Sequence, residues 1–221
     1  MPKTGELSIG AGETADFEEL ARILGWSFGD IAQGAMNWLT SAGVENIRVA
    51  RRNGRVLGGL AVVPMGQWFG GSSVPMLGIA GVAVAPEARG HRVALSMMRT
   101  TLAEARQRGT ALSTLYPATL TLYRLAGYEL AGSRFRFTAR LKDLPLGPRD
   151  QDVHPIGDAD HGAVEATYRS WATKQGGALD RSDYVWRRVR APREGVARGF
   201  LVRGEAGIEG YVYAVQRSNP G

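Results

Sequence analysis

Cysteine is absent from this 221-residue chain, which excludes disulfides, thiolate catalysis and metal sites built on cysteine. Histidine is scarce too, and His91, His154 and His161 are scattered along the chain, so we expect no metal site. No long apolar run is present, and the first residues lack the apolar core of a signal peptide. We therefore expect no membrane association and a cytoplasmic location.

A concentrated block of positive charge is also missing. The formal net charge is +6, but the arginines are spread out and form only short pairs such as Arg51-Arg52 and Arg187-Arg188. Because no basic run has aromatic residues interleaved with it, we expect no nucleic-acid partner. Hydrophobic residues make up 44% and charged residues 22% of the chain, which is typical of a globular protein of one or two domains.

Apolar periodicity predicts an α/β fold with a mixed sheet for residues 1–141. Asn53-Gly54 between two alternating stretches is a strong hairpin signal, Gly81 inside an apolar run suggests a bulge, and Phe135 and Phe137 alternate with arginines as in a strand with one wet face. The expected order is a helix at 14–28, antiparallel strands at 46–51 and 55–64, a buried strand at 77–85, a helix at 93–108, a strand at 111–117, a short helix at 119–127 and a strand at 133–141.

The second part of the chain repeats the layout of the first. After a linker predicted at 142–152, VHPIGDADHGAVEATYRSW parallels LSIGAGETADFEELARILGW, and GFLVRGEAGIEGYVYAVQ parallels the predicted hairpin. We therefore expect a second, partial copy of the same unit at 153–221, and we interpret the chain as the front part of a longer protein. An incomplete sheet would leave uncovered apolar residues such as Tyr211 and Val215. The alternative is a natural short form whose open sheet edge is covered by a partner.

The segment APEARGHRVA joins the buried strand to the helix at 93–108. Backbone N–H groups at the start of a helix have no intrahelical partner, and together with the helix dipole and arginine they suit a phosphate. The alternative is a glycine-containing turn with incidental arginines. The predicted pyrophosphate cradle consists of Arg89, Gly90, His91, Arg92, Val93 and Ala94.

This strand–turn–helix order, with VAVAPEARGHRVA and LYRLAGY in register, resembles the GNAT superfamily of acyl-CoA-dependent N-acetyltransferases. The resemblance covers residues 5–141 well and residues 153–221 more weakly. The tandem layout is most similar to the Enhanced intracellular survival (Eis) acetyltransferases, which have two fused GNAT-like units followed by a sterol-carrier-like domain. The resemblance implies acetyl-CoA as cosubstrate, a small cationic amine or a lysine side chain as acceptor, and a homo-oligomer.

The resemblance also implies roles for individual residues. Val82 and Val84 would pair with the pantetheine arm, the Val82 N–H would polarise the thioester carbonyl, and Tyr123 would protonate the leaving thiolate. Trp26 and Phe28 match positions where the family places aromatics around the amine, and an aromatic wall suits a cation. The alternative for Val82 and Val84 is an ordinary β-bulge, and the alternative for Tyr123 is a core tyrosine. The alternative for Trp26 and Phe28 is a hydrophobic core stripe.

The sequence departs from the family in two ways. Arg92 stands where the family usually has glycine, and its side chain either points outward and adds charge or crowds the phosphate site. No general base can be named, because the family uses a distant C-terminal carboxylate and Gly221 does not match it. A non-catalytic acyl-CoA-binding or regulatory module, or an inactive fragment, is therefore the alternative function.

Overall fold

The computed structural model describes residues 5–29, 32–145, 147, 151–192, 195–205 and 207–216. The chain divides into two compact units. The first comprises Met1–Gln67 and Ser73–Glu129, and the second comprises Trp68–Ser72 and Leu130–Gly221. The predicted linker at 142–152 falls partly on residues 146 and 148–150, which lie outside the described residues, as do the last five residues of the predicted second domain.

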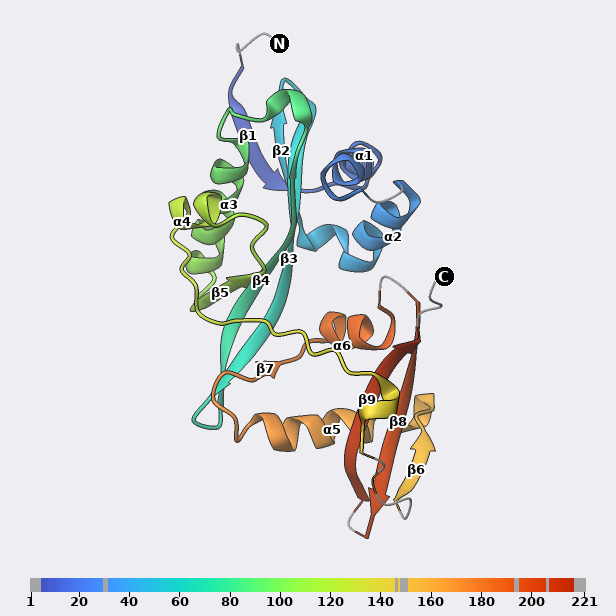
Figure 1. Cartoon of the computed structure of the whole chain (residues 1–221). Coiled ribbons are helices and arrows are strands. Elements are labelled where there is room, and N and C mark those ends of the chain that lie inside the picture. The colour runs from blue at the N-terminus through green and yellow to red at the C-terminus, as the bar shows by residue number, and fades with distance from the viewer. Residues whose placement is uncertain are drawn as a thin grey trace. The chain divides into compact units, whose positions relative to one another are not determined.

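The first unit is built on a mixed sheet in the order β1-β2-β3-β4-β5. β1 and β3 are antiparallel to β2, whereas β5 is parallel to β4. Helices α1 and α2 lie on one face of this sheet and α3 and α4 on the other (Figure 1). The elements are β1 (Leu7–Ala11), α1 (Phe17–Phe28), α2 (Ala32–Ala42), β2 (Ile47–Arg52), β3 (Arg55–Phe69), β4 (Ser72–Val84), α3 (Val93–Gln107), β5 (Leu112–Leu115) and α4 (Leu120–Leu125), with 3₁₀ turns at Thr14–Asp16, Val44–Asn46 and Pro86–Ala88.

Most of the predicted elements of this unit are confirmed by the structure. Asn53 and Gly54 both have positive φ, 53° and 74°, as the tight hairpin turn requires. Gly81 has φ 61°, which favours glycine, and a Cβ there would lie 2.4 Å from the ring of Trp38, so the close approach of this ring explains the glycine. Helix α2, which carries Trp38, had no clear signal in the sequence and was not predicted.

The predicted strand at 133–141 is wrong. Residues 130–140 have no regular secondary structure, and Phe135 and Phe137 are 75% and 92% exposed. Alternation makes a strand only where a neighbouring strand accepts its hydrogen bonds and a core covers its apolar face. Residues 133–140 have neither within the described part of the chain.

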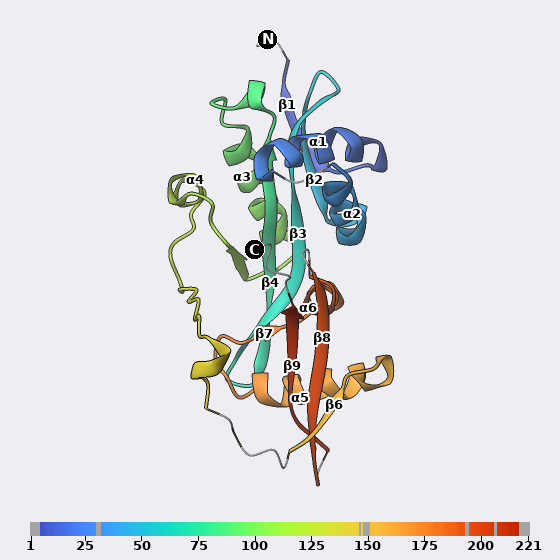
Figure 2. The same cartoon turned by 45° about the vertical axis from the view of Figure 1, so that its right-hand side comes forward.

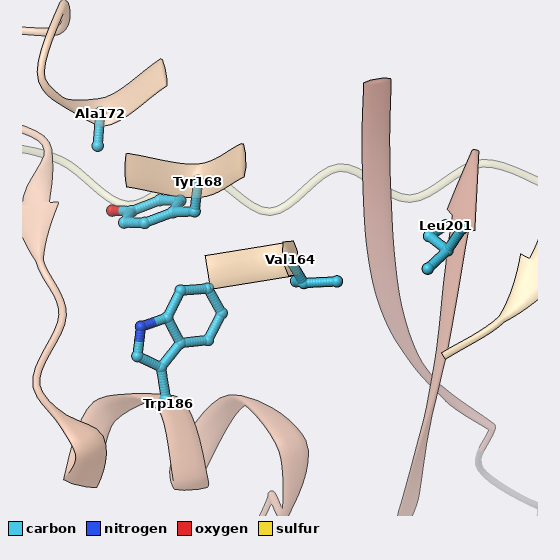
Figure 3. Close-up of a cluster of buried hydrophobic side chains, with 5 residues drawn as sticks. All are labelled: Val164, Tyr168, Ala172, Trp186 and Leu201. Carbon is cyan, nitrogen blue, oxygen red and sulfur yellow. The ribbon is translucent and has the colours of Figure 1, made fainter. Parts of the chain in front are cut away.

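The second unit has a smaller sheet in the order β6-β8-β9, in which all pairs are antiparallel. Its buried core brings together α5, α6 and β8: Val164, Tyr168 and Ala172 come from α5, Trp186 from α6 and Leu201 from β8 (Figure 3). The elements are β6 (Asp152–Pro155), α5 (His161–Ala172), β7 (Leu179–Asp180), α6 (Asp183–Arg190), β8 (Val196–Gly204) and β9 (Gly207–Gln216), as Figure 2 shows from a second direction, with 3₁₀ turns at Leu141–Asp143 and Asp158–Asp160.

An aspartate–arginine pair recurs at matching places in the two units. In the first unit the Asp16 carboxylate accepts the Glu13 N–H at 2.7 Å and the Arg51 Nε–H at 3.1 Å. In the second unit the Asp160 carboxylate accepts the Gly157 N–H at 3.0 Å and an N–H of Arg203 at 3.0 Å. The two arginines also sit at matching β-bulges, because the register shifts at Ala50/Arg51 in the first hairpin and at Val202/Arg203 in the second. The two units therefore share detailed local geometry as well as element order.

The hairpins differ in what lies beside them. A Cβ on Gly58 of β3 would lie 2.4 Å from the carbonyl oxygen of Ala83 on β4, whereas a Cβ on the matching Gly210 of β9 would meet nothing within 4 Å. Val215 is exposed, as expected for an uncovered edge, but Tyr211 is half-buried against the core and is bonded to Arg181. Tyr211 is thus not one of the uncovered apolar residues that the incomplete sheet was expected to leave.

Candidate active site

The parallel strands β4 and β5 pair over only part of their length. Their ladder runs from Met76↔Leu112 to Ile79↔Leu115, where β5 ends, while β4 continues to Val84. The last residues of β4 therefore have one backbone edge that β5 does not cover. Gly81, whose φ is 61°, lies at the start of this stretch.

The hydrogen bonds of Ala85 indicate which groups face this opening. Its N–H donates to the Leu57 carbonyl of β3 at 2.8 Å, and the Ala83 carbonyl also faces β3. Because successive residues of a strand direct their backbone groups to opposite edges, Val82 and Val84 direct theirs to the open edge. Arg89 already uses one of these groups, since its Nε–H donates to the Val84 carbonyl at 3.2 Å.

The turn that follows β4 presents the start of α3 without a side-chain cap. Arg92 is the N-cap residue and makes no capping hydrogen bond, although its carbonyl accepts the Ser96 N–H at 3.0 Å. The N–H groups of the first helical turn, which begins with Val93 and Ala94, are therefore available to an anion. Arg89, Gly90, His91 and Arg92 are all exposed around this helix start.

Arg92 adopts the backbone conformation that glycine would favour. Its φ is 59° and its ψ 15°, in the left-handed region, and Gly90 two residues earlier has φ 78°. A non-glycine residue there costs about 1–2 kcal/mol, so the turn tolerates arginine at some expense. The exposed side chain fits the outward-pointing alternative better than the crowding one.

Tyr123 lies on α4 and is buried, with 8% of its surface exposed. Burial raises the pKa of its hydroxyl above the ordinary value, so the group stays protonated at neutral pH. Within the described part of the chain this hydroxyl has no hydrogen-bond partner, which leaves its proton available. A buried, protonated donor of this kind is suited to general acid catalysis.

Trp26 and Phe28 are exposed at the end of α1, at 51% and 50%, and are therefore not part of the core. The Arg22 guanidinium lies 4.0 Å from the Trp26 ring centroid and already supplies a cation to that ring. The end of α1 also comes close to the turn, because an N–H of Arg89 lies 3.5 Å from the Ser27 hydroxyl. The structure thus brings the predicted aromatic pair near the predicted phosphate turn.

Two kinds of feature are not found in the described residues. No group of three or more metal-ligating His, Asp or Glu side chains comes together there. Nor does that part of the chain contain a helix long and apolar enough to cross a bilayer.

Comparison with known proteins is consistent with this geometry. A family model described as an acetyltransferase (GNAT) domain matches residues 9–131, more than half of the chain. The chain belongs to the GNAT acetyltransferase domain family. The predicted GNAT fold with its mixed sheet is confirmed. No curated protein matches this GNAT chain significantly.

Several solved structures are similar over nearly the whole chain. A GCN5-related N-acetyltransferase from Kribbella flavida is 29% identical, with a TM-score of 0.83 over 97% of this chain and 55% of that one. One from Anabaena variabilis is 30% identical, with a TM-score of 0.75 over 97% and 60%. Eis1 from Mycobacterium abscessus is 19% identical, with a TM-score of 0.66 over 94% and 52%. The GNAT chain thus spans little more than half the length of these structures, and the likeness to Eis1 is one of fold.

Sequence reasoning did not identify every group at this site. Ser113 and Tyr128 form hydrogen bonds next to Tyr123 but were not among the predicted site residues. The Gly127-Tyr128 pair was a usable signal for Tyr128, because it is part of the motif that places Tyr123. Nothing in the local sequence distinguishes Ser113 from any other small strand residue.

Proposed function

We propose that the first unit transfers an acetyl group from acetyl-CoA to an amine, with Tyr123 as the general acid. The observation that carries this proposal is the uncovered edge of β4, which leads directly into an uncapped helix start. A long ligand with an amide-rich arm and a pyrophosphate at one end fits such a site, because the arm can pair with a strand edge and the phosphates with helix N–H groups.

This arrangement supports the following cofactor contacts. Val82 and Val84 would pair with the pantetheine arm, and the Val82 N–H would polarise the thioester carbonyl. The pyrophosphate would sit over Gly90, His91, Val93 and Ala94. Arg89 holds the turn to β4 through the Val84 carbonyl, and the exposed Arg92 adds positive charge beside the phosphates.

The chemistry needs one proton donor and one proton acceptor. The neutral amine nitrogen attacks the thioester carbon, the carbon–sulfur bond breaks, and the sulfur takes the proton of the Tyr123 hydroxyl. The new amide nitrogen loses its proton to solvent, and the tyrosine is then reprotonated by solvent. We assign no side chain of this chain as the base.

The acceptor is proposed to be a small, cationic amine or a lysine side chain. The exposed Trp26 and Phe28 would line its path, and the amine would compete with Arg22 for the Trp26 ring. We propose with it membership of the Eis-like tandem group, on the internal repeat, and a cytoplasmic location, on the absence of cysteine. A homo-oligomeric assembly is proposed on the edge of β9 with which no described strand pairs.

The test combines acetyl-CoA binding with thiol release. Calorimetry should show acetyl-CoA binding to the chain, and a panel of polyamines, aminoglycosides and lysine peptides should release free coenzyme A. Gly90→Ala should weaken binding, because alanine is strained at φ 78°. The matched control Gly132→Ala changes an exposed glycine of the second unit that has open space around it. Binding without any transfer would favour the alternative of a non-catalytic acyl-CoA-binding module.

A further inference from the structure

Ser113 and Tyr128 form a hydrogen-bonded chain beside Tyr123. Ser113 lies on β5 directly opposite Leu77 of β4, in the part of the ladder that precedes the opening. Its Oγ lies 3.0 Å from the Leu77 carbonyl oxygen and 2.5 Å from the Tyr128 hydroxyl oxygen. The hydrogen-bonded chain therefore joins β4 and β5 to Tyr128, which comes shortly after the end of α4.

The direction of the protons in this chain follows from the groups themselves. A backbone carbonyl only accepts, so the single Ser113 hydroxyl proton is directed to Leu77. The Ser113 oxygen must then accept, so Tyr128 donates its own hydroxyl proton to it. Tyr128 consequently has no free proton to give to another group, whereas Tyr123 has.

Tyr128 is also held firmly against Tyr123. Gly127, with φ 98°, ends α4, and the Tyr128 N–H donates to the Tyr123 carbonyl at 3.0 Å. The two rings meet edge to face, with centroids 6.3 Å apart and an interplanar angle of 75°. Any movement of the Tyr128 ring therefore alters the packing around Tyr123.

We propose that the chain Leu77–Ser113–Tyr128 is a positioning device that fixes the Tyr123 ring at the opening between β4 and β5. Tyr123 is the proton donor and Tyr128 is its anchor. This inference rests on the proposed function, because it assigns Tyr123 its role as acid. It goes further by giving different roles to Tyr123 and Tyr128, whose rings are in contact, and by adding Ser113 as a positioning residue.

The test compares Tyr128→Phe, Ser113→Ala and the double variant with the parent. Each single variant should lower kcat by about three- to thirtyfold and leave the KM for acetyl-CoA within about twofold. The double variant should be no slower than the slower single variant, because both changes break one chain. Tyr213→Phe in the second unit is the control and should leave kcat unchanged.

A second readout does not need activity. Spectroscopic titration of tyrosine ionisation, taken as the difference from Tyr123→Phe, reports the Tyr123 hydroxyl alone. Burial raises its pKa, so loosening the Tyr128 ring should admit water and lower that pKa toward the ordinary value. The charged groups next to α4 are unchanged in these variants: Arg99 of α3 donates to the Leu125 carbonyl, and Arg124 pairs with Glu129.

The outcomes are distinct. If Tyr128→Phe lost as much activity as Tyr123→Phe, the division of the two tyrosines into acid and anchor would be overturned. Additive losses in the double variant, or a Tyr123 titration that does not move in either single variant, would show that the chain does not position Tyr123. If the parent transferred nothing, the proposed function would fail, and the titration would still decide whether the anchor exists.

Discussion

The two units begin with the same elements but continue differently after the hairpin. Both start with a strand, a 3₁₀ turn held by an aspartate, two helices and a bulged hairpin. The first unit continues into β4, the proposed phosphate turn and α3, whereas the described residues of the second unit end with the hairpin. The proposed proton donor and cofactor contacts all come after the hairpin of the first unit. Trp26 and Phe28, which are proposed to line the path of the amine, lie on α1 in the shared part.

The cores of the two units differ as well. The first is mainly aliphatic, with Leu20, Ile23, Leu39 and Met97 almost completely buried. The buried core of the second unit contains two large rings, Tyr168 and Trp186, beside three aliphatic side chains. A cation lies against these rings, because the Arg181 guanidinium is 3.8 Å from the Tyr168 ring centroid and 4.7 Å from that of Trp186. A smaller unit gains stability from few large rings and a cation held between them.

The largest expected effect would locate the chemistry in the first unit. Tyr123→Phe keeps the ring and its packing but removes the proton, so turnover should fall by about 10²–10⁴-fold while acetyl-CoA binding is nearly kept. Steady-state thiol release and calorimetry measure the two quantities. Tyr213→Phe in the second unit serves as the control. Equal losses of turnover in both variants would contradict the assignment of the chemistry to the first unit.

The matching glycines of the two hairpins give the next largest difference. Gly58→Ala would place a Cβ 2.4 Å from the Ala83 carbonyl oxygen, so the free energy of unfolding should fall by about 2–3 kcal/mol. Gly210→Ala has open space and should change it by less than about 0.5 kcal/mol. Denaturant unfolding of both variants checks this. A large loss at Gly210 would mean that another strand approaches β9.

The matching aspartates should differ less. Asp16→Ala leaves the Glu13 N–H and Arg51 without their acceptor at a buried position, at a cost of about 2–3 kcal/mol of unfolding free energy. Asp160→Ala breaks the same contacts in a more exposed place, so about 1 kcal/mol is expected. Thermal unfolding compares the stability of the two variants. A larger loss for Asp160→Ala would refute the view that burial explains the difference.

The smallest effect concerns Arg92, which the second unit does not match among its described residues. Arg92→Gly removes left-handed strain but adds chain entropy to the unfolded state, so stability should change by less than about 0.5 kcal/mol. Loss of the charge should weaken acetyl-CoA binding by about three- to tenfold. Arg92→Lys is the control that keeps the charge. Tighter binding of the glycine variant in calorimetry would instead show that the arginine crowds the phosphates.

Much of the first unit was predictable because its signals are local. The Asn53-Gly54 turn and the apolar periodicity of α1 and α3 each depend on a few neighbouring residues. The failure at 133–141 has the opposite cause, since a strand needs a partner that its own sequence does not contain. The exposure of Phe28 decides against the core-stripe alternative. Periodicity could not decide this, because it gives a helix face but not where the cover over that face ends.

The sequence alone determined most elements of the first unit, the repeat and the turn at Arg89–Ala94, because propensity, periodicity and glycine placement are properties of short stretches. Only the tertiary structure decided how far β5 runs along β4, and hence which backbone groups are left open. It also decided which tyrosine has a free proton, because Ser113 reaches Tyr128 only through the pairing of two strands that lie 36 residues apart in the chain at Leu77 and Ser113. Hydrogen bonds between distant segments, unlike local propensities, exist only once the chain has folded.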